Sequence, residues 1–205
     1  MMRALAVLVS YVFHPLWTPL IVLGLLWTVD PWLRMQPAVM TYVASVMLIN
    51  AVAPAVSLYA LHRRGVLGDL EVSDRSERTL PFLIVLFYQA LGWFALTRPG
   101  VYLPRELLGL VVAMMAALVL ALLLNRHIKL SMHLMANGGG FGAIWAFNQL
   151  HGLGLEAWLP MGFLLAGIVG WSRMVMGVHT PRELALGFLV GFAMMRAVVE
   201  SGWSP

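Results

Sequence analysis

The chain has 205 residues, of which 61% are hydrophobic and 11% are charged. Soluble domains have about 45–50% apolar and about 25% charged residues, so this chain has too little polar surface for a water-soluble globule. The formal net charge is +4 and cysteine is absent, which excludes a disulfide framework and a thiolate site. In a membrane protein a basic excess lies in the loops, near anionic lipid. We therefore expect an integral membrane protein, and not a disordered, nucleic-acid-binding or soluble nucleotide-binding protein.

Apolar blocks follow one another along the chain at residues 4–27, 38–61, 80–97, 107–124, 134–150, 158–171 and 184–199. A helix needs about 20 apolar residues to cross a bilayer core, and the last two blocks are short for this. Helices satisfy their backbone polar groups within lipid, and the ten-residue alternation of a membrane barrel is not seen in the sequence. We expect an all-α, polytopic transmembrane helical bundle of about six to seven membrane segments, forming a single integral membrane domain over residues 1–205.

The N-terminal block imitates a signal peptide, with a basic residue followed by an apolar run. The run continues past Pro15 to Trp27 without a small-residue cleavage site. We therefore expect a retained first helix over this block.

Seven segments would place the loops 62–79, 125–133 and 172–183 on one side of the membrane, together with the N-terminus. These loops hold eight of the 13 Lys and Arg residues and four of the six histidines, namely His62, His127, His133 and His179. Ionisable groups at the mouth of a bundle are costly unless they are paired or functional. Cations that bind a substrate are not topology signals, so the sequence leaves the membrane orientation open.

Fixed cations beside two or more histidines are the groups needed to bind and cleave a phosphate ester. The cations stabilise the negative charge of the transition state. One imidazole can attack phosphorus while another protonates the leaving oxygen. Ser131 precedes the expected fifth helix and His179 precedes the expected seventh, so two helix N-termini should direct their positive ends at one mouth.

Residues 172–183, SRMVMGVHTPRE, resemble the third signature of the type-2 phosphatidic acid phosphatase superfamily, Ser-Arg-x5-His-x3-Asp, with Glu183 in place of Asp. Residues 129–133, KLSMH, are similar to the second signature, Pro-Ser-Gly-His, with Leu130 for Pro and Met132 for Gly. Residues 74–81, DRSERTLP, loosely resemble the first signature, Lys-x6-Arg-Pro; Arg78 is not adjacent to the proline, and Glu71 stands at the lysine position. The resemblance covers about residues 74–191, with a phosphatase-like core expected over about 74–199.

The resemblance implies an integral membrane lipid phosphatase that uses no metal and no cofactor. It implies that His179 is the nucleophile that forms a phosphohistidine, that Glu183 holds its imidazole, and that His133 is the general acid. It further implies a set of phosphate-binding residues: Arg173, Lys129, Ser131, Arg78, Arg75 and Ser172. The expected substrate is a lipid phosphate or diphosphate of the phosphatidate, phosphatidylglycerol phosphate or polyprenyl diphosphate class. The expected location is the cell membrane, specifically the inner membrane of a bacterium, with membrane lipids and no nucleic acid as partners; the oligomeric state stays open.

Several of these features have a structural alternative. Thr180, Pro181 and Glu183 also form the pattern of a helix capping box, a role that can coexist with holding His179. The segment 74–78 could be a solvated ion-pair loop. Glycines 138–140 and 142 predict close helix packing or leave room for an acyl or prenyl chain. For the whole protein, the alternative is a non-catalytic lipid-phosphate binding or transport protein on the same fold.

Overall fold

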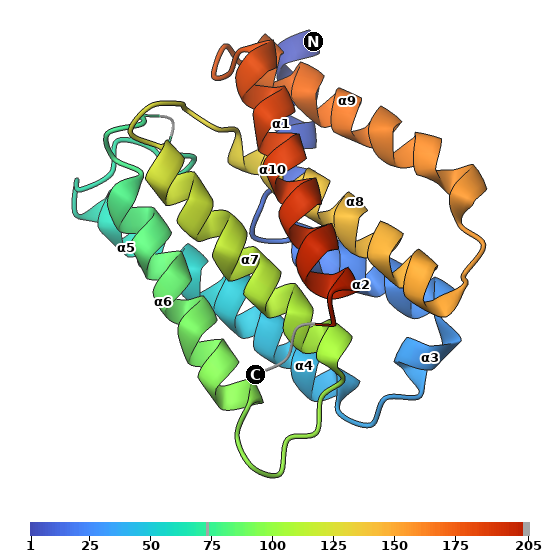
Figure 1. Ribbon diagram of the computed structural model, residues 1–205. Coiled ribbons are helices and arrows are strands. Elements are labelled where there is room, and N and C mark those ends of the chain that lie inside the picture. Colours follow the sequence, from blue (N-terminus) through green and yellow to red (C-terminus); the bar gives the residue numbers. More distant parts are fainter. Residues whose placement is uncertain (73, 203–205) are drawn as a thin grey trace.

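The computed structural model describes residues 1–72 and 74–202 as a bundle of helices, and this part of the chain contains no strand (Figure 1). Its α-helices are α1 (Met2–Val12), α2 (Thr18–Val29), α3 (Pro31–Arg34), α4 (Val39–Val46), α5 (Ala53–Arg63), α6 (Thr79–Leu96), α7 (Arg105–Leu124), α8 (Met132–His151), α9 (Leu159–Val175) and α10 (Pro181–Glu200). A π-helical segment, η1 (Met47–Val52), joins α4 to α5, and a short 3₁₀ segment, η2 (Glu156–Trp158), precedes α9. The expected all-α class is confirmed.

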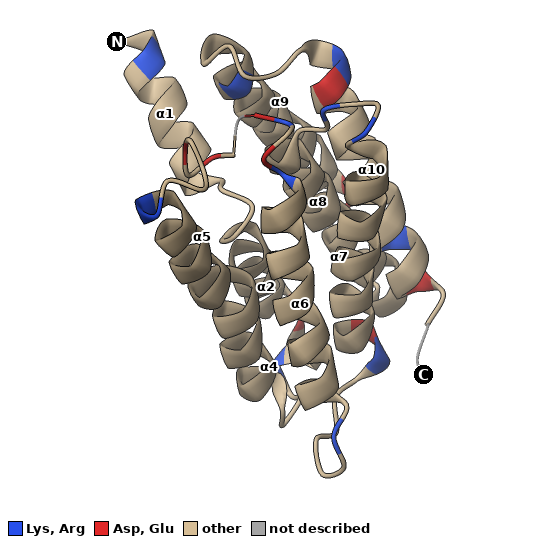
Figure 2. Cartoon of the chain, turned by 90° about the vertical axis from the view of Figure 1, so that its left-hand side faces the viewer, with Lys and Arg blue, Asp and Glu red and all other residues tan. Residues whose placement is uncertain are grey.

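Within the described residues, four helical stretches are long and apolar enough to cross a membrane: Val39–Arg63, Thr79–Leu96, Arg105–Leu124 and Glu156–Val175. The first contains α4, η1 and α5, and the last contains η2 and α9. Charged residues gather mainly at the two ends of the bundle, with largely uncharged helix bodies between them (Figure 2). This distribution matches a protein whose middle lies in lipid.

The first apolar block is two helices, α1 and α2, separated at residues 13–17. Proline lacks a backbone N–H, and it disfavours helical geometry at the preceding residue, so Pro15 accounts for the break after His14. The prediction of one helix over residues 4–27 is therefore wrong. The break also brings the His14 ring to 5.2 Å from the ring of His133.

Helices α8 and α10 form the most extensive contact in the bundle, with their N-termini at the same end. The backbone N–H of Ser131 donates to the carbonyl oxygen of Glu183 at 3.3 Å. A Cβ atom on Gly187 would lie 2.6 Å from the Ser131 carbonyl oxygen, and one on Gly142 would lie 2.7 Å from that of Phe192. The prediction of close helix packing is confirmed at Gly142, Gly187 packs as closely although the sequence pattern did not single it out, and the two helix N-termini lie side by side.

Candidate functional site

A cavity of about 200 Å³ lies beside the N-termini of α8 and α10. Most of its wall is apolar, built from side chains of α2, α4, α6, α7, α8 and α10. Its lining by charged residues and histidines is His14, Glu71, Arg78, His133, Arg173 and His179. The cavity therefore joins a polar group at one end of the bundle to an apolar space between the helices.

His179 and Glu183 form the best-defined pair at the polar end. Nδ1 of His179 lies 2.8 Å from Oε2 of Glu183. The same oxygen accepts from the N–H of Thr180 at 3.2 Å, while the N–H of Glu183 donates to Oγ1 of Thr180 at 3.4 Å. The capping box and the imidazole contact thus coexist. Because a carboxylate only accepts, Nδ1 carries the proton and Nε2 keeps its lone pair.

Three cations act on the His179 ring, namely Arg78, Arg173 and Lys129. Burial is the main factor that lowers the pKa of His179, the hydrogen bond to Glu183 opposes it, and the cations lower it further. The pKa of Lys129 is lowered as well, first by burial and then by Arg78. The setting thus favours the neutral imidazole at neutral pH, and this is the nucleophilic form.

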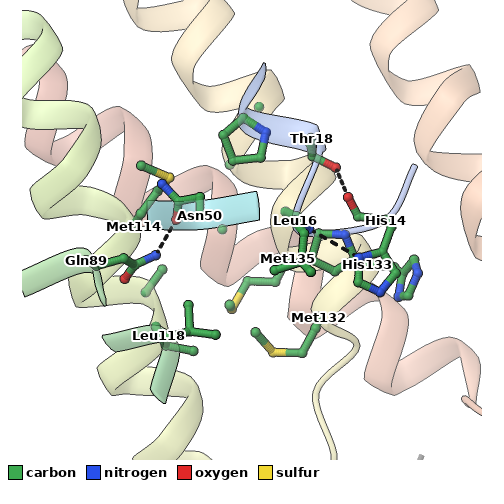
Figure 3. A pocket seen from close by; sticks show the side chains of 18 of the residues that line it. His14, Leu16, Thr18, Asn50, Gln89, Met114, Leu118, Met132, His133 and Met135 are labelled. Carbon is green, nitrogen blue, oxygen red and sulfur yellow. Dashed lines mark hydrogen bonds between the residues drawn. The ribbon is translucent and has the colours of Figure 1, made fainter. Parts of the chain in front are cut away.

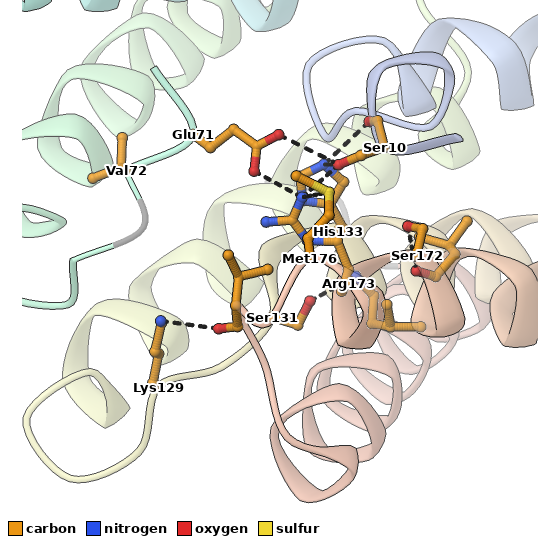
Figure 4. A network of polar contacts seen from close by, with 12 residues as sticks. Ser10, Glu71, Val72, Lys129, Ser131, His133, Ser172, Arg173 and Met176 are labelled. Carbon is orange, nitrogen blue, oxygen red and sulfur yellow. Dashed lines mark hydrogen bonds and ion pairs between the residues drawn. The ribbon is translucent and has the colours of Figure 1, made fainter. Parts of the chain in front are cut away.

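Arg173 lies in the last turn of α9 with only 2% of its surface exposed. Its Nη1 donates to Oε2 of Glu71 at 2.8 Å and also to Oγ of Ser10 (Figure 4). Its Nε has no hydrogen-bond partner among the described residues. Arg173 therefore connects α9 to α1 and to the loop before α6, and Glu71 balances its charge.

His133 is buried in the first turn of α8 and bonds to α1. Its Nε2 lies 3.2 Å from both the carbonyl oxygen and the hydroxyl of Ser10. The Ser10 hydroxyl is also 3.5 Å from Oε1 of Glu71. Ser10 and Glu71 are site residues that sequence reasoning missed: Ser10 belongs to no motif, whereas Glu71 is marked only by standing at the lysine position of the first signature.

Arg78 is a buried residue that fixes the loop before α6. Its Nε donates to the carbonyl of Val72 at 3.1 Å, and its Nη1 donates to that of Leu130 at 2.8 Å. Val72 has a φ of +50°, which is rare for a β-branched residue. The Asp74 carboxylate accepts from Ser76 instead of pairing with Arg78. The interpretation of residues 74–78 as a solvated ion-pair loop is therefore wrong for Arg78.

The other predicted phosphate-binding residues fall into two groups. Lys129 donates to the carbonyl of Val178 at 3.0 Å, directly before His179, and the buried Ser131 caps α8 by accepting from Leu134 N at 3.4 Å. Both lie beside the site.

Ser172 and Arg75 lie outside the cavity lining, as Lys129 and Ser131 do, but their hydrogen bonds lead away from His179. The buried Ser172 hydroxyl donates to the Val169 carbonyl of its own helix at 2.7 Å. Arg75 is exposed, and its carbonyl accepts from Asn125 at 3.1 Å. The structure brings together His179, His133, Glu183, Arg173, Arg78, Lys129 and Ser131, and leaves Ser172 and Arg75 apart.

Within the described part of the chain, no three His, Asp or Glu side chains are grouped so that they could hold a metal ion. Comparisons of the chain with family models, with curated proteins and with solved structures give no match. A functional conclusion therefore rests on the geometry and chemistry of this site.

Proposed function

We propose that this chain is an integral membrane phosphatase that hydrolyses a lipid phosphate or diphosphate through a phosphohistidine on His179. The observation that carries the proposal is the setting of His179: its Nδ1 is held by Glu183 at 2.8 Å, and the charges of Arg78, Arg173 and Lys129 act on its ring. An imidazole with a fixed tautomer, placed among cations, is suited to attack a phosphorus atom that bears negative charge.

In the proposed reaction, Nε2 of His179 attacks phosphorus and the P–O bond to the lipid breaks. His133 gives a proton to the departing oxygen. Water then gives a proton to His133 and attacks the phosphorus, the P–N bond breaks, and inorganic phosphate leaves with both histidines restored. Arg173, Arg78 and Lys129 hold the phosphate oxygens, and for Arg173 to do so the carboxylate of Glu71 has to move aside.

The substrate is proposed to be a lipid because the cavity continues from the polar group into an apolar space. A chain bound there supplies affinity, while the cations act on the charge that develops at phosphorus. Phosphatidate, phosphatidylglycerol phosphate and polyprenyl diphosphates all fit this description. We further propose a multi-pass protein of a bacterial cell membrane, in which α8, α10 and the broken segment formed by α1 and α2 together raise the four spans to as many as seven.

The test is phosphate release from these lipids by purified protein, in detergent and with a metal chelator present. We expect chelator-resistant release that His179→Ala lowers by at least about 10³-fold, because the nucleophile is lost. His127→Ala is the matched control, since His127 is an exposed histidine of the neighbouring loop and its loss should leave release unchanged. Release that survives His179→Ala, or that the chelator abolishes, contradicts the proposal.

A second candidate is a non-catalytic lipid-phosphate binder or transporter. One observation favours it: Glu71 already balances the charge of Arg173, which leaves less positive charge to stabilise a transition state. A binder releases no phosphate, still binds the lipid phosphate after His179→Ala, and loses binding after Arg173→Ala.

A further inference from the structure

The apolar part of the cavity contains two buried carboxamides that the proposed reaction does not use. Asn50 lies in η1 and Gln89 lies in α6, and Nε2 of Gln89 donates to Oδ1 of Asn50 at 2.9 Å. Their exposed fractions are 4% and 5%, and both line the cavity. Figure 3 shows the pair at one side of the pocket and His133 at the other, with Met132 and Met135 between them.

Each carboxamide has a polar atom left over. Nδ2 of Asn50 and Oε1 of Gln89 have no hydrogen-bond partner among the described residues. If both amide groups are turned over, the hydrogen bond reverses and one donor and one acceptor still remain. Unpaired polar groups are costly in an apolar interior, and costlier in a span that crosses lipid. The pair therefore holds one unpaired donor and one unpaired acceptor at the wall of the cavity, where neighbouring atoms cover both and have to shift before a ligand reaches them.

The pair is held by packing on both sides. One turn after Gln89, a Cβ atom on Gly92 would collide with the side chain of Ile49. On the other side, the hydroxyls of Ser57 and Tyr88 are 2.9 Å apart. These contacts fix the spacing between the Val39–Arg63 rod and α6. The π-helical turn that carries Asn50 is a rare element that is often found at functional sites.

The distance from the pair to the polar end follows from α6 itself. Arg78 is the residue at the N-cap of α6, and Gln89 lies further along the same helix. A rise of 1.5 Å per residue puts the two residues about 16 Å apart along the helix axis. A ligand that reaches both places has an anionic end, an apolar stretch, and a group at about this distance that both donates and accepts.

We propose that Asn50 and Gln89 form a binding subsite for a hydroxyl group on the apolar chain of the lipid phosphate, about 16 Å from its phosphate. A hydroxyl can accept from the free carboxamide N–H or donate to the free carboxamide oxygen, so this one group is chemically matched to either atom. The proposal rests on the proposed function, because it takes the phosphate to lie at His179. It adds that the protein prefers lipid phosphates whose apolar chain carries a hydroxyl group.

The test compares three single-chain probes: octadecyl phosphate, 12-hydroxyoctadecyl phosphate and 6-hydroxyoctadecyl phosphate. Their affinities for the purified protein are measured in detergent from tryptophan fluorescence, and phosphate release is measured in parallel. The 12-hydroxy group lies at the required distance, and we expect it to tighten binding about tenfold over the plain chain. The 6-hydroxy group falls in the apolar stretch and should weaken binding.

The double variant Asn50→Leu with Gln89→Leu should bind the plain chain at least as well as wild type and lose the preference for the 12-hydroxy chain. If it does not fold, Gln89→Leu alone removes the free acceptor and serves the same purpose. The matched control is Ser57→Ala with Tyr88→Phe, which removes the neighbouring contact between the same two segments outside the cavity. It should keep the preference.

Equal affinity of wild type for the plain and 12-hydroxy chains overturns the subsite, since water then satisfies the pair; phosphate release from both leaves the proposed enzyme standing. A preference for the 12-hydroxy chain without phosphate release supports the subsite and contradicts the phosphatase. Failure of all three probes to bind overturns both proposals.

Discussion

Among single residues, Glu183 serves two neighbours with one carboxylate. A capping box puts the third helical residue back against the N-cap backbone, and here the residue just before the cap is His179. The carboxylate that closes the box therefore also reaches the imidazole at 2.8 Å. A common pattern at helix N-termini thus also orients the proposed nucleophile, and no further change in the backbone is needed for it.

The two roles of Glu183 can be separated by a pair of variants. In Glu183→Gln the amide oxygen can still accept from Thr180, so the cap persists while the charge beside His179 is lost. We expect phosphate release to fall by roughly 10²- to 10⁴-fold, with little change in melting temperature. Thr180→Ala removes the hydroxyl that caps the helix, which should cost about 1 kcal/mol of stability and spare most of the release. Equal loss of release in both variants would contradict separate roles.

The carboxylate of Glu71 pairs with Arg173 and would compete there with a phosphate oxygen. In Glu71→Gln the guanidinium loses its counter-charge, so the variant should melt at a lower temperature and bind inorganic phosphate about tenfold more tightly. Calorimetric titration with phosphate measures this without relying on turnover.

Glu77→Gln is the matched control, because Glu77 lies in the same loop but accepts from Gly68 N at 2.9 Å. It should leave phosphate affinity unchanged. If Glu71→Gln behaves like Glu77→Gln, the carboxylate does not compete for the anion.

The sequence predicts those site residues whose contact partners lie close to them along the chain. His179 and Glu183 are four residues apart at a helix start, so local geometry alone suffices to pair them. Ser10 and Glu71 reach Arg173 across separations of 163 and 102 residues, which only tertiary packing can produce. Ser172 is the opposite case. The third signature implies that it binds phosphate, but within α9 its hydroxyl donates to a carbonyl three residues earlier.

At the scale of elements, α8 and α10 act as one unit that positions His133 and His179 at its N-terminal end. Their starts could be predicted from capping residues and their contact from glycines, whereas their parallel alignment depends on the fold as a whole. The α1–α2 break was missed because hydropathy continues unchanged across Pro15, although the backbone does not.

A side chain at the α8–α10 contact should disturb this unit. A Cβ atom on Gly191 would collide with the backbone carbonyl of Met135, which cannot swing away as a side chain can. We expect Gly191→Ala to cost about 1–3 kcal/mol and to lower phosphate release, measured by thermal unfolding in detergent and by assay. Gly167→Ala in α9 is the control, because nothing lies within 4 Å of its Cβ position. A Gly191→Ala protein as stable as wild type would show that the contact is looser than described.

For the whole molecule, composition and lipid physics were enough to predict an all-helical membrane protein. The count of spans was harder, because α8 and α10 have the length of a span but carry glycines and polar residues that keep them outside the four apolar stretches. Hydropathy reports how favourably a helix lies in lipid, whereas α8 and α10 are stabilised largely by packing against each other.

Sidedness can be tested directly because the chain has no cysteine. Arg126 follows α7 and Tyr102 precedes it, so a spanning α7 puts these exposed residues on opposite sides of the membrane. We expect a membrane-impermeant thiol reagent to label Arg126→Cys and Tyr102→Cys from opposite sides, with Arg64→Cys labelled together with Arg126→Cys. Labelling of all three from one side would contradict the α6–α7 hairpin as a membrane-crossing unit.

The close contact between α8 and α10 also bears on how the protein is made. An apolar stretch such as Arg105–Leu124 can leave the translocation machinery by itself, since its own side chains favour lipid. Helix α8 has less independence, because Gly138 and Gly142 pack against α10, which is synthesised later. We expect α8 to stay with the insertion machinery until α10 has been synthesised, so that His133 and His179 enter the bilayer region together and no half-built site is exposed to lipid phosphates.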